Sequence, residues 1–400
     1  MLIYSHDTFG LGHLQRCLKI AERLVARLPR LSILLVTGSP VVHRFTLPPG
    51  VDYLKLPAVR KVGPEKYEAR SMGIPYQLIL ELRANLLTQA VQNFAPHILL
   101  VDHSPAGMRG EMLPALHWLR ASGRPCTKIL GLRDIVDDPE TVRKLWHDEG
   151  IYELMRTVYD RILVYGPREV FDLAAEYDFS PDLVNKTTYC NYVTDVHRNG
   201  IRASATNETT RPTKRVVVTI GGGDGAVDLI IGNYLSMVEK YRSEIDFESS
   251  IITGPFVAED EFRQLQRRGR RVGVTVRSFV KSTSPYFRKS DLVVSTGGYN
   301  TVTQILCHAR RALIIPRTMY RHEQLLRAAC MARQGWVTMI PPEELTFDRL
   351  YREIRSLLMD SKQAMASLRS KQSHLLDGAA GVASVCEGIL VAQSQEGRPL

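Results

Sequence analysis

Short apolar runs alternate with longer segments of helical periodicity in the first half of the chain. Runs such as SILLVTG, HILLVD and TKILGL have the length and composition of buried strands. Between the runs, residues 14–28 and 76–94 carry apolar side chains at helical spacing. Strands that alternate with helices in this way predict βαβ units around a parallel sheet.

The alternation breaks between residues 196 and 214, where the sequence is polar and rich in turn-forming residues. A second series of strand-like runs follows, from RVVVTI through SSIITG, DLVVST and RALIIP. The length of 400 residues is also comfortable for two domains. We therefore expect an α/β protein with Rossmann-like domains at residues 1–195 and 215–385, a linker at 196–214 and a tail at 386–400.

Composition narrows the class of protein. The chain has 44% hydrophobic and 24% charged residues, which is ordinary for a soluble globular protein. It lacks an apolar run of the roughly 18 to 20 residues that span a bilayer. The six cysteines are scattered without a C-x-x-C pair, so neither a disulfide framework nor a zinc site is indicated. The chain opens on a strand pattern and not on a secretory leader, which favours a cytoplasmic protein.

The charge points to an acidic partner. A net charge of +10 would attract nucleic acid, an anionic lipid surface or a phosphorylated small molecule. The basic residues are dispersed, without a zinc-finger spacing or an aromatic RNA-binding signature, so we do not expect nucleic acid as a partner. The basic cluster at residues 263–271 is either a solvated helix end or a contact with an anionic membrane.

Two glycine-rich turns follow strand patterns in the second half of the chain. GGGDGA follows RVVVTI, and TGGYN follows DLVVS, each directly before a helical pattern. Glycine lets the backbone approach a ligand closely, and the new helix presents unpaired N–H groups to a phosphate. Two such turns in one domain predict a phosphate-bearing ligand. Neither is a Walker A loop nor a complete dinucleotide-binding fingerprint, which disfavours an ATPase or a standard dehydrogenase.

The turn after the first predicted strand reads FGLGHLQRC and contains Gly10, Gly12 and His13. Ligands of parallel sheets bind beyond the carboxyl ends of the strands, so this turn is a candidate site. The glycines would let the loop approach a ligand, and a histidine titrates near neutral pH. His13 is therefore a candidate base, with a structural role in the turn as the alternative.

The same rule selects polar residues after two later strands. Asp102 and His103 follow HILLV, and Arg133 and Asp134 follow TKILGL. They are candidate ligands of an acceptor, and Asp102 is the alternative base; helix capping or local pairing are the structural alternatives. The acidic pair at residues 137–138 precedes a proline, which predicts a helix start and no metal site.

Four segments together carry a family resemblance: FGLGHLQRC, GGGDGA, STGGYNTVTQIL and IPRTMYRHEQLLRA, in this order. They resemble glycosyltransferases of the GT-B fold, and among these family 28, which includes the N-acetylglucosaminyltransferase of peptidoglycan synthesis, and its bacterial branch of predicted glycosyltransferases. The resemblance spans nearly the whole chain and is strongest from about residue 215 to 340. It implies two Rossmann-like domains facing across an interdomain cleft, with the donor on the C-terminal domain and the acceptor on the N-terminal one.

The resemblance also implies the chemistry and its residues. A sugar would pass from a nucleotide diphosphate sugar to a hydroxyl acceptor, with inversion and without a metal or other cofactor; the acceptor could be a saccharide, a lipid-linked or a small molecule. It places Gly12, Gly222, Gly223, Asp224, Ser295, Gly297 and Gly298 at the donor diphosphate, Phe279, Val280, Thr301 and Gln304 at the base and ribose, and Glu323 and Gln324 at the donor sugar. Gly10, His103, Arg133 and Asp134 fall on the acceptor side.

One position departs from the family pattern, and two other functions stay open. The family glutamate that binds the ribose hydroxyls is replaced by Gln304, which leaves the nucleotide open. GLGHLQRCLKIA is also similar to nucleotide-sugar hydrolases of nonulosonic acid pathways, in which water replaces the acceptor. The segment 58–76, which could cover an acceptor, favours transfer. A non-catalytic nucleotide-sugar-binding protein is the third reading. We expect a cytoplasmic location, or a peripheral one at the inner face of the membrane.

Overall fold

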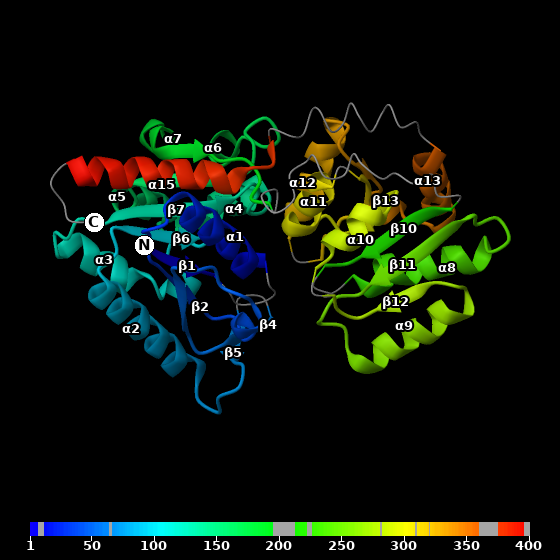
Figure 1. Ribbon diagram of the computed structural model, residues 1–400, viewed down its shortest axis with the longest axis horizontal. Helices are drawn as coiled ribbons and strands as arrows, with labels where there is room; N and C mark the ends of the chain where they lie inside the picture. Colours follow the sequence, from blue (N-terminus) through cyan, green and yellow to red (C-terminus); the bar gives the residue numbers. More distant parts are fainter. Residues whose placement is uncertain are drawn as a thin grey trace. The chain divides into compact units, whose positions relative to one another are not determined.

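The computed structural model describes residues 1–6, 12–63, 66–194, 213–221, 226–280, 282–308, 310–319, 321–359 and 375–395. The chain divides into two compact units (Figure 1). The first contains Met1–Val193 and Asp377–Leu400, and the second contains Thr194–Leu376. Each unit is built on a parallel sheet, as the alternating pattern predicts.

The sheet of the first unit has seven strands in the order β3-β2-β1-β6-β7-β8-β9. They are β1 (Leu2–Ser5), β2 (Ile33–Thr37), β3 (Val51–Lys55), β6 (Ile98–Asp102), β7 (Thr127–Arg133), β8 (Arg161–Tyr165) and β9 (Thr187–Tyr189), and all pairs are parallel. Every residue of β1 and β6 is buried, which is expected of central strands covered on both faces. The strand order reverses between β1 and β6, so the carboxyl ends of these two strands form a topological switch point.

Helices lie on both sides of this sheet (Figure 1). They are α1 (Gly12–Arg27), α2 (Tyr76–Phe94), α3 (Leu113–Ala121), α4 (Pro139–Asp148), α5 (Ile151–Thr157), α6 (Leu173–Glu176), α7 (Pro181–Lys186) and α15 (Gly378–Gln395). The helical spacing predicted α1 and α2 correctly. The residues before α2 form an antiparallel hairpin of β4 (Val59–Gly63) and β5 (Lys66–Ala69). Asp138 caps α4 by accepting a hydrogen bond from the Thr141 N–H, so the acidic pair starts a helix as predicted.

The end of the chain differs from the sequence expectation. Residues 378–385 were expected in the second domain and residues 386–400 as a tail, but α15 runs through this boundary to Gln395, and its residues group with the first unit. A Cβ at Gly378 would collide with the backbone of residues 191–192, which shows how closely the start of α15 packs there. The helix is apolar, and a sequence pattern does not reveal which of two cores an apolar helix covers.

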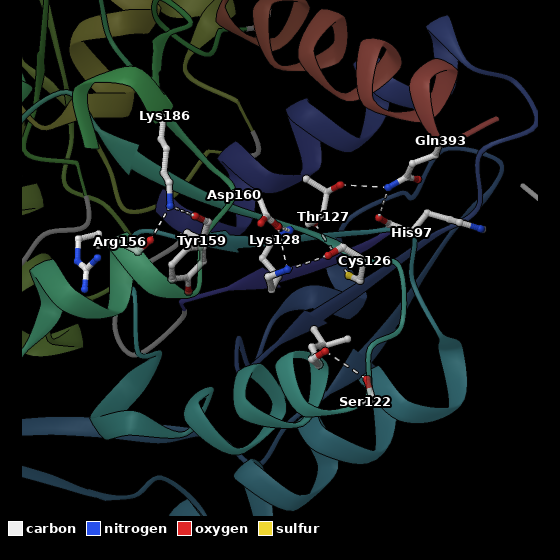
Figure 2. Close-up of polar contacts among 11 residues, drawn as sticks. His97, Ser122, Cys126, Thr127, Lys128, Arg156, Tyr159, Asp160, Lys186 and Gln393 are labelled. Carbon is white, nitrogen blue, oxygen red and sulfur yellow. Dashed lines mark hydrogen bonds and ion pairs between the residues drawn. The ribbon is translucent and has the colours of Figure 1, made fainter. Parts of the chain in front are cut away.

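Polar contacts join both ends of α15 to the rest of the first unit. Near its start, Arg23 of α1 pairs with Asp377 at 2.9 Å. Near its end, the Gln393 amide donates to the hydroxyl of Thr127 at 3.0 Å and to the carbonyl of His97 at 3.4 Å (Figure 2). In the same region the Lys186 ammonium donates to the carbonyls of residues 156 and 159, at the end of α5 (Figure 2). The last helix is therefore part of the first unit at both ends.

The sheet of the second unit has six parallel strands in the order β12-β11-β10-β13-β14-β15. They are β10 (Lys214–Thr219), β11 (Phe247–Ile252), β12 (Thr275–Arg277), β13 (Leu292–Ser295), β14 (Arg311–Ile314) and β15 (Thr338–Met339). Its helices are the π-helical turn Val227–Gly232, α8 (Asn233–Lys240), α9 (Glu259–Arg271), α10 (Ser284–Lys289), α11 (Tyr299–Cys307), α12 (Glu323–Arg333) and α13 (Phe347–Met359). The order reverses between β10 and β13, which creates a second switch point.

The basic cluster at residues 263–271 belongs to α9, an amphipathic helix with an acidic first turn and a basic last turn. This charge order complements the helix dipole. Arg268 also pairs with Glu239 of α8 at 2.7 Å. Of the helices in the described parts of the chain, none is long and apolar enough to cross a membrane.

Candidate active site

The first candidate site lies at the switch point of the first sheet. Asp102 is the last residue of β6, and His13 follows Gly12, the first residue of α1. The carboxyl ends of β1 and β6 are neighbours in the sheet, so the two side chains meet although they are far apart in sequence. Gly10 lies outside the described residues.

His13 and Asp102 are in direct contact. The Nδ1 atom of His13 is 2.7 Å from Oδ2 of Asp102. Asp102 is fully buried, whereas 16% of the His13 side chain is exposed. Nη2 of Arg16 is also 2.9 Å from Nδ1, but an ionised carboxylate can only accept hydrogen bonds, so the shorter contact with Asp102 requires the proton of the neutral imidazole on Nδ1 and leaves the lone pair on Nε2. The pair therefore orients a histidine that can accept a proton from a ligand.

A buried arginine completes the cluster. Arg16 lies one helical turn beyond His13 on α1, and it donates from Nε to Oδ1 of Asp102 at 3.0 Å and from Nη2 to Oδ2 at 2.8 Å. Its exposed fraction is 1%, and its guanidinium lies over the ring of Tyr165 at 5.4 Å. The sequence analysis missed Arg16, although it stands three residues after His13, a spacing that places two side chains on one helix face.

The electrostatics keep the histidine neutral and the aspartate charged. Burial lowers the pKa of His13 below its ordinary value, and this outweighs the attraction of Asp102; Arg16 and Arg133 lower it further. Burial acts to raise the pKa of Asp102, but Arg16 and His13 outweigh it, so that pKa lies below its ordinary value. Near neutral pH the cluster therefore contains an uncharged imidazole beside a carboxylate.

Two further histidines surround His13. The ring of His103 lies 4.9 Å from that of His13, and the ring of His6 lies 5.5 Å from it, measured between centroids. His103 has a φ of 70°, a left-handed conformation that costs energy for a non-glycine residue, and its N–H donates to the Gly131 carbonyl at 2.7 Å. The sequence analysis missed His6, although it follows β1 directly, and the strand-end rule could have selected it.

The two remaining acceptor-side candidates are placed differently from each other. Arg133 ends β7, and its charge acts on His13. Asp134 is 2% exposed and accepts a hydrogen bond from the N–H of Ile135 at 2.8 Å, a local turn contact. The structure thus brings His103 and Arg133 to His13, whereas the described hydrogen bond of Asp134 serves its own loop.

The second candidate site lies at the switch point of the other sheet. Gly221 follows β10 with a φ of 68°, and a Cβ placed on it would lie 3.6 Å from the hydroxyl of Thr301 in α11. Ser295 ends β13, Gly297 has a φ of 85°, and Gly298 is the N-cap residue of α11. The two predicted turns therefore begin side by side. Gly222, Gly223 and Asp224 lie outside the described residues.

The residues predicted for the base and ribose lie on α11 and just after β12. Gln304 is half-buried on this helix, and its Oε1 accepts a hydrogen bond from the Thr283 hydroxyl at 2.5 Å. Phe279 is 51% exposed and Val280 is half-buried, both just after β12. The sequence analysis missed Thr283. Its hydrogen bond to Oε1 fixes the orientation of the Gln304 amide.

The predicted donor-sugar residues begin α12 and pack against the glycine turn. Gln324 is 8% exposed, and its Oε1 accepts from the N–H of Arg317 at 3.3 Å. Glu323 is paired with Arg327 at 3.5 Å. The fully buried Arg327 also donates to the carbonyl of Gly297 at 3.1 Å, so one guanidinium connects the start of α12 to the turn.

Solved structures with the same fold define the class of protein. The crystal structure of Acinetobacter baumannii MurG matches with a TM-score of 0.61 at 10% identity, covering 97% of this chain and 98% of that one. The crystal structure of TcCGT1 in complex with UDP matches with a TM-score of 0.66 at 11% identity, with the same coverage. The predicted class is confirmed: the chain has the GT-B fold of glycosyltransferases.

The sequence comparisons point to a particular family within that class. Residues 216–381 match the glycosyltransferase family 28 C-terminal domain. The UDP-N-acetylglucosamine--N-acetylmuramyl-(pentapeptide) pyrophosphoryl-undecaprenol N-acetylglucosamine transferase of Alkaliphilus metalliredigens is 26% identical over 180 residues, which are 43% of this chain and 49% of that protein. The chain spans about half the length of the curated relatives it matches. The predicted resemblance to family 28 is thus confirmed.

Proposed function

We propose that the protein is an inverting glycosyltransferase that moves a sugar from a nucleotide diphosphate sugar to a hydroxyl acceptor. The contact between His13 and Asp102 at the carboxyl ends of β1 and β6 carries this proposal. Nε2 of His13 takes the proton of the acceptor hydroxyl as its oxygen attacks the anomeric carbon. Asp102 holds the ring by Nδ1 and stabilises the imidazolium that forms. A single displacement, opposite the departing diphosphate, inverts the anomeric centre.

The second unit would hold the donor. Gly298 is the N-cap residue of α11, so the backbone N–H groups and the positive dipole end of the first turn would face a diphosphate bound there. These preorganised donors would stabilise the charge of the leaving group, and we propose that the reaction needs no metal ion. Excess EDTA should leave the rate of sugar transfer unchanged, and a loss restored by Mg²⁺ or Mn²⁺ would contradict this part.

We propose a uridine nucleotide as the donor. The names of the curated relatives specify UDP-N-acetylglucosamine as donor, and the structure of TcCGT1 contains UDP. The Thr283 hydroxyl binds Oε1 of Gln304, and we propose that the amide contacts the ribose, while Phe279 offers an exposed ring for the base. Glu323 and Gln324 would bind the hydroxyl groups of the sugar.

We propose a lipid-linked acceptor and peripheral binding to an anionic membrane. Exposed apolar residues lie just before α2 and in its first turns: Met72 (47% exposed), Ile74 (37%), Leu78 (52%) and Leu82 (39%), here called the apolar stripe. Leu78 and Leu82 are four residues apart on α2 and so lie on one helix face, and Met72 and Ile74 come just before the helix. Arg70 precedes the stripe, is exposed, and belongs to a chain of net charge +10. Sedimentation with phosphatidylglycerol vesicles but not with phosphatidylcholine vesicles is expected, and Leu78→Glu should weaken it.

One assay separates transfer from its two alternatives. UDP release from UDP-sugars is measured with and without a polyprenyl-linked acceptor, together with the melting temperature. A transferase releases UDP only with the acceptor, and a hydrolase releases it without one. A binding protein releases none, although UDP raises its melting temperature by mass action.

A further inference from the structure

We propose that Arg16 is a positioning residue that shares the carboxylate of Asp102 with His13 and thereby sets the pH range in which His13 can act as the base. This inference rests on the proposed function, because it assigns Arg16 a task in the same proton transfer. It concerns a residue that makes no contact with the acceptor in that mechanism and acts only through its two neighbours.

The geometry supports a positioning role. Arg16 binds both oxygens of Asp102, with Nε at 3.0 Å from Oδ1 and Nη2 at 2.8 Å from Oδ2. Because both oxygens are held by one planar group, the carboxylate cannot rotate about its χ2 angle without breaking this fork. Oδ2 is also the atom that faces Nδ1 of His13, at 2.7 Å. The plane of the arginine therefore fixes the direction in which the imidazole points.

The charge of Arg16 acts on the proton affinity of His13. Nη2 of Arg16 lies 2.9 Å from Nδ1 of His13, so the cation is as close to the ring as the carboxylate is. An isolated carboxylate would favour the imidazolium, whereas a carboxylate neutralised by an arginine favours it far less. The neutral, proton-accepting form of His13 is then the stable form near neutral pH.

The other groups around His13 act in the same direction or contribute no charge. Arg133, from the end of β7, is a second cation that acts on His13. His6 and His103 follow β1 and β6 and are further groups that gain positive charge on protonation. Tyr165 of β8 faces Arg16, and burial raises the pKa of its hydroxyl far above neutrality, so it stays uncharged. Asp102 is thus the anion that faces the ring among these described neighbours, and Arg16 is its counter-ion.

A matched control lies in the same unit. Arg83 and Glu111 form a second fully buried pair, with Nε to Oε2 and Nη2 to Oε1 both at 2.6 Å. The described hydrogen bonds of Arg83 go to Glu111 and to the carbonyl of Pro57, and none of them reaches His13. Arg83→Met therefore reproduces the general cost of removing a buried arginine without touching the base.

The experiment measures kcat/KM against pH for three Arg16 variants and the control. We expect Arg16→Met to move the acidic limb of the profile up by about one pH unit, because His13 then faces an uncompensated carboxylate. Turnover at pH 7 should fall about 10-fold or more, with the donor KM little changed. Arg16→Lys keeps a cation but loses the fork, so turnover should fall while the limb stays near its original position. Arg16→Met combined with Asp102→Asn should bring the limb back down.

Two further readouts make every result decisive. Thermal melting of each variant shows whether the first unit, which contains Arg16, remains folded, and the Arg16→Lys variant carries the test if Arg16→Met does not fold. NMR titration of the His13 Cε1 proton follows its pKa without any turnover, so the inference can be judged even if the wild-type protein transfers no sugar. An unchanged His13 titration in folded Arg16→Met, or an equal shift in Arg83→Met, would overturn the proposal. So would a shifted limb in Arg16→Lys with normal turnover.

Discussion

Two fully buried arginine–carboxylate pairs in the first unit differ in their third partner. Arg83 and Glu111 are joined by the hydroxyl of Tyr4, which donates to Oε1 of Glu111 at 2.7 Å. Arg16 and Asp102 are joined by His13. Burial, together with the charge of Glu111, raises the pKa of Tyr4 well above its ordinary value, so this cluster keeps its protons at every physiological pH. His13 is instead partly exposed, and burial lowers its pKa below the ordinary value, so its ring is a neutral proton acceptor near neutral pH.

The difference shows what turns a buried ion pair into part of a reactive site. Both pairs carry the desolvation cost of two charges, and neither is by itself evidence of chemistry. In one the third group is enclosed and its proton stays in place. In the other the third group reaches solvent from a switch point of the sheet, where it can exchange a proton with a ligand.

The largest expected effect separates stability from catalysis. Arg83→Met leaves Glu111 as an unpaired buried charge and should lower the free energy of unfolding by about 3 to 5 kcal/mol. Denaturant titration measures this, and the milder Glu111→Gln variant should lose less. At a temperature where the variant remains folded, its pH profile of transfer should match that of the wild type. A displaced profile would mean that the two pairs are not independent.

The next effect is on turnover. His13→Ala should lower kcat by about 100-fold or more, the usual contribution of a general base, with little change in melting temperature. His13→Gln tests the alternative that the ring only hydrogen-bonds a diphosphate, because an amide would then preserve much of the rate. Steady-state kinetics and thermal melting of both variants measure these outcomes. Joint loss of melting temperature and activity would assign His13 a structural role.

A smaller effect belongs to the second unit and should leave the first unchanged. Gln304→Glu restores a carboxylate that can accept both from Thr283 and from a ribose hydroxyl, so uridine nucleotides should bind more tightly by on the order of 1 kcal/mol. Calorimetry with UDP measures the gain in affinity. An equal gain for UMP would show that the added contact is with the nucleoside. Equal or weaker binding would mean that position 304 does not face the ribose.

The smallest expected effect is the pH dependence of stability. The folded state lowers the pKa of His13, so the unfolded chain binds more protons once the pH falls below about 6.5, and stability decreases there. Asp102, whose pKa is also lowered, contributes stability that is lost at still lower pH. Between pH 7 and pH 5, about the range of histidine titration, the melting temperature of His13→Gln should fall less than that of the wild type. An identical decrease would exclude His13 as its source.

Sequence patterns were sufficient for the features that depend on local order. The alternating runs predicted the strands of both sheets except the short β9, and the strand-end rule led to His13 and Asp102, because parallel strands bring their carboxyl ends to one edge. Arg16 was missed because its partner Asp102 is 86 positions away, and its spacing from His13 shows a shared helix face but not the carboxylate that both bind. The packing of α15 was missed for the same reason, since its contacts with Arg23 and Thr127 join opposite ends of the chain.

The most direct test of the central claim is the acceptor-dependent release of UDP from a UDP-sugar, measured from pH 5 to pH 9 (about two units either side of neutrality) for the wild type and His13→Ala. We expect UDP release only when the acceptor is present. The wild-type rate should fall as the pH drops through an acidic pKa. The His13→Ala rate should be about 100-fold lower and should lack this acidic limb. Release that is independent of the acceptor, or a His13→Ala enzyme with the rate and pH profile of the wild type, would contradict the account.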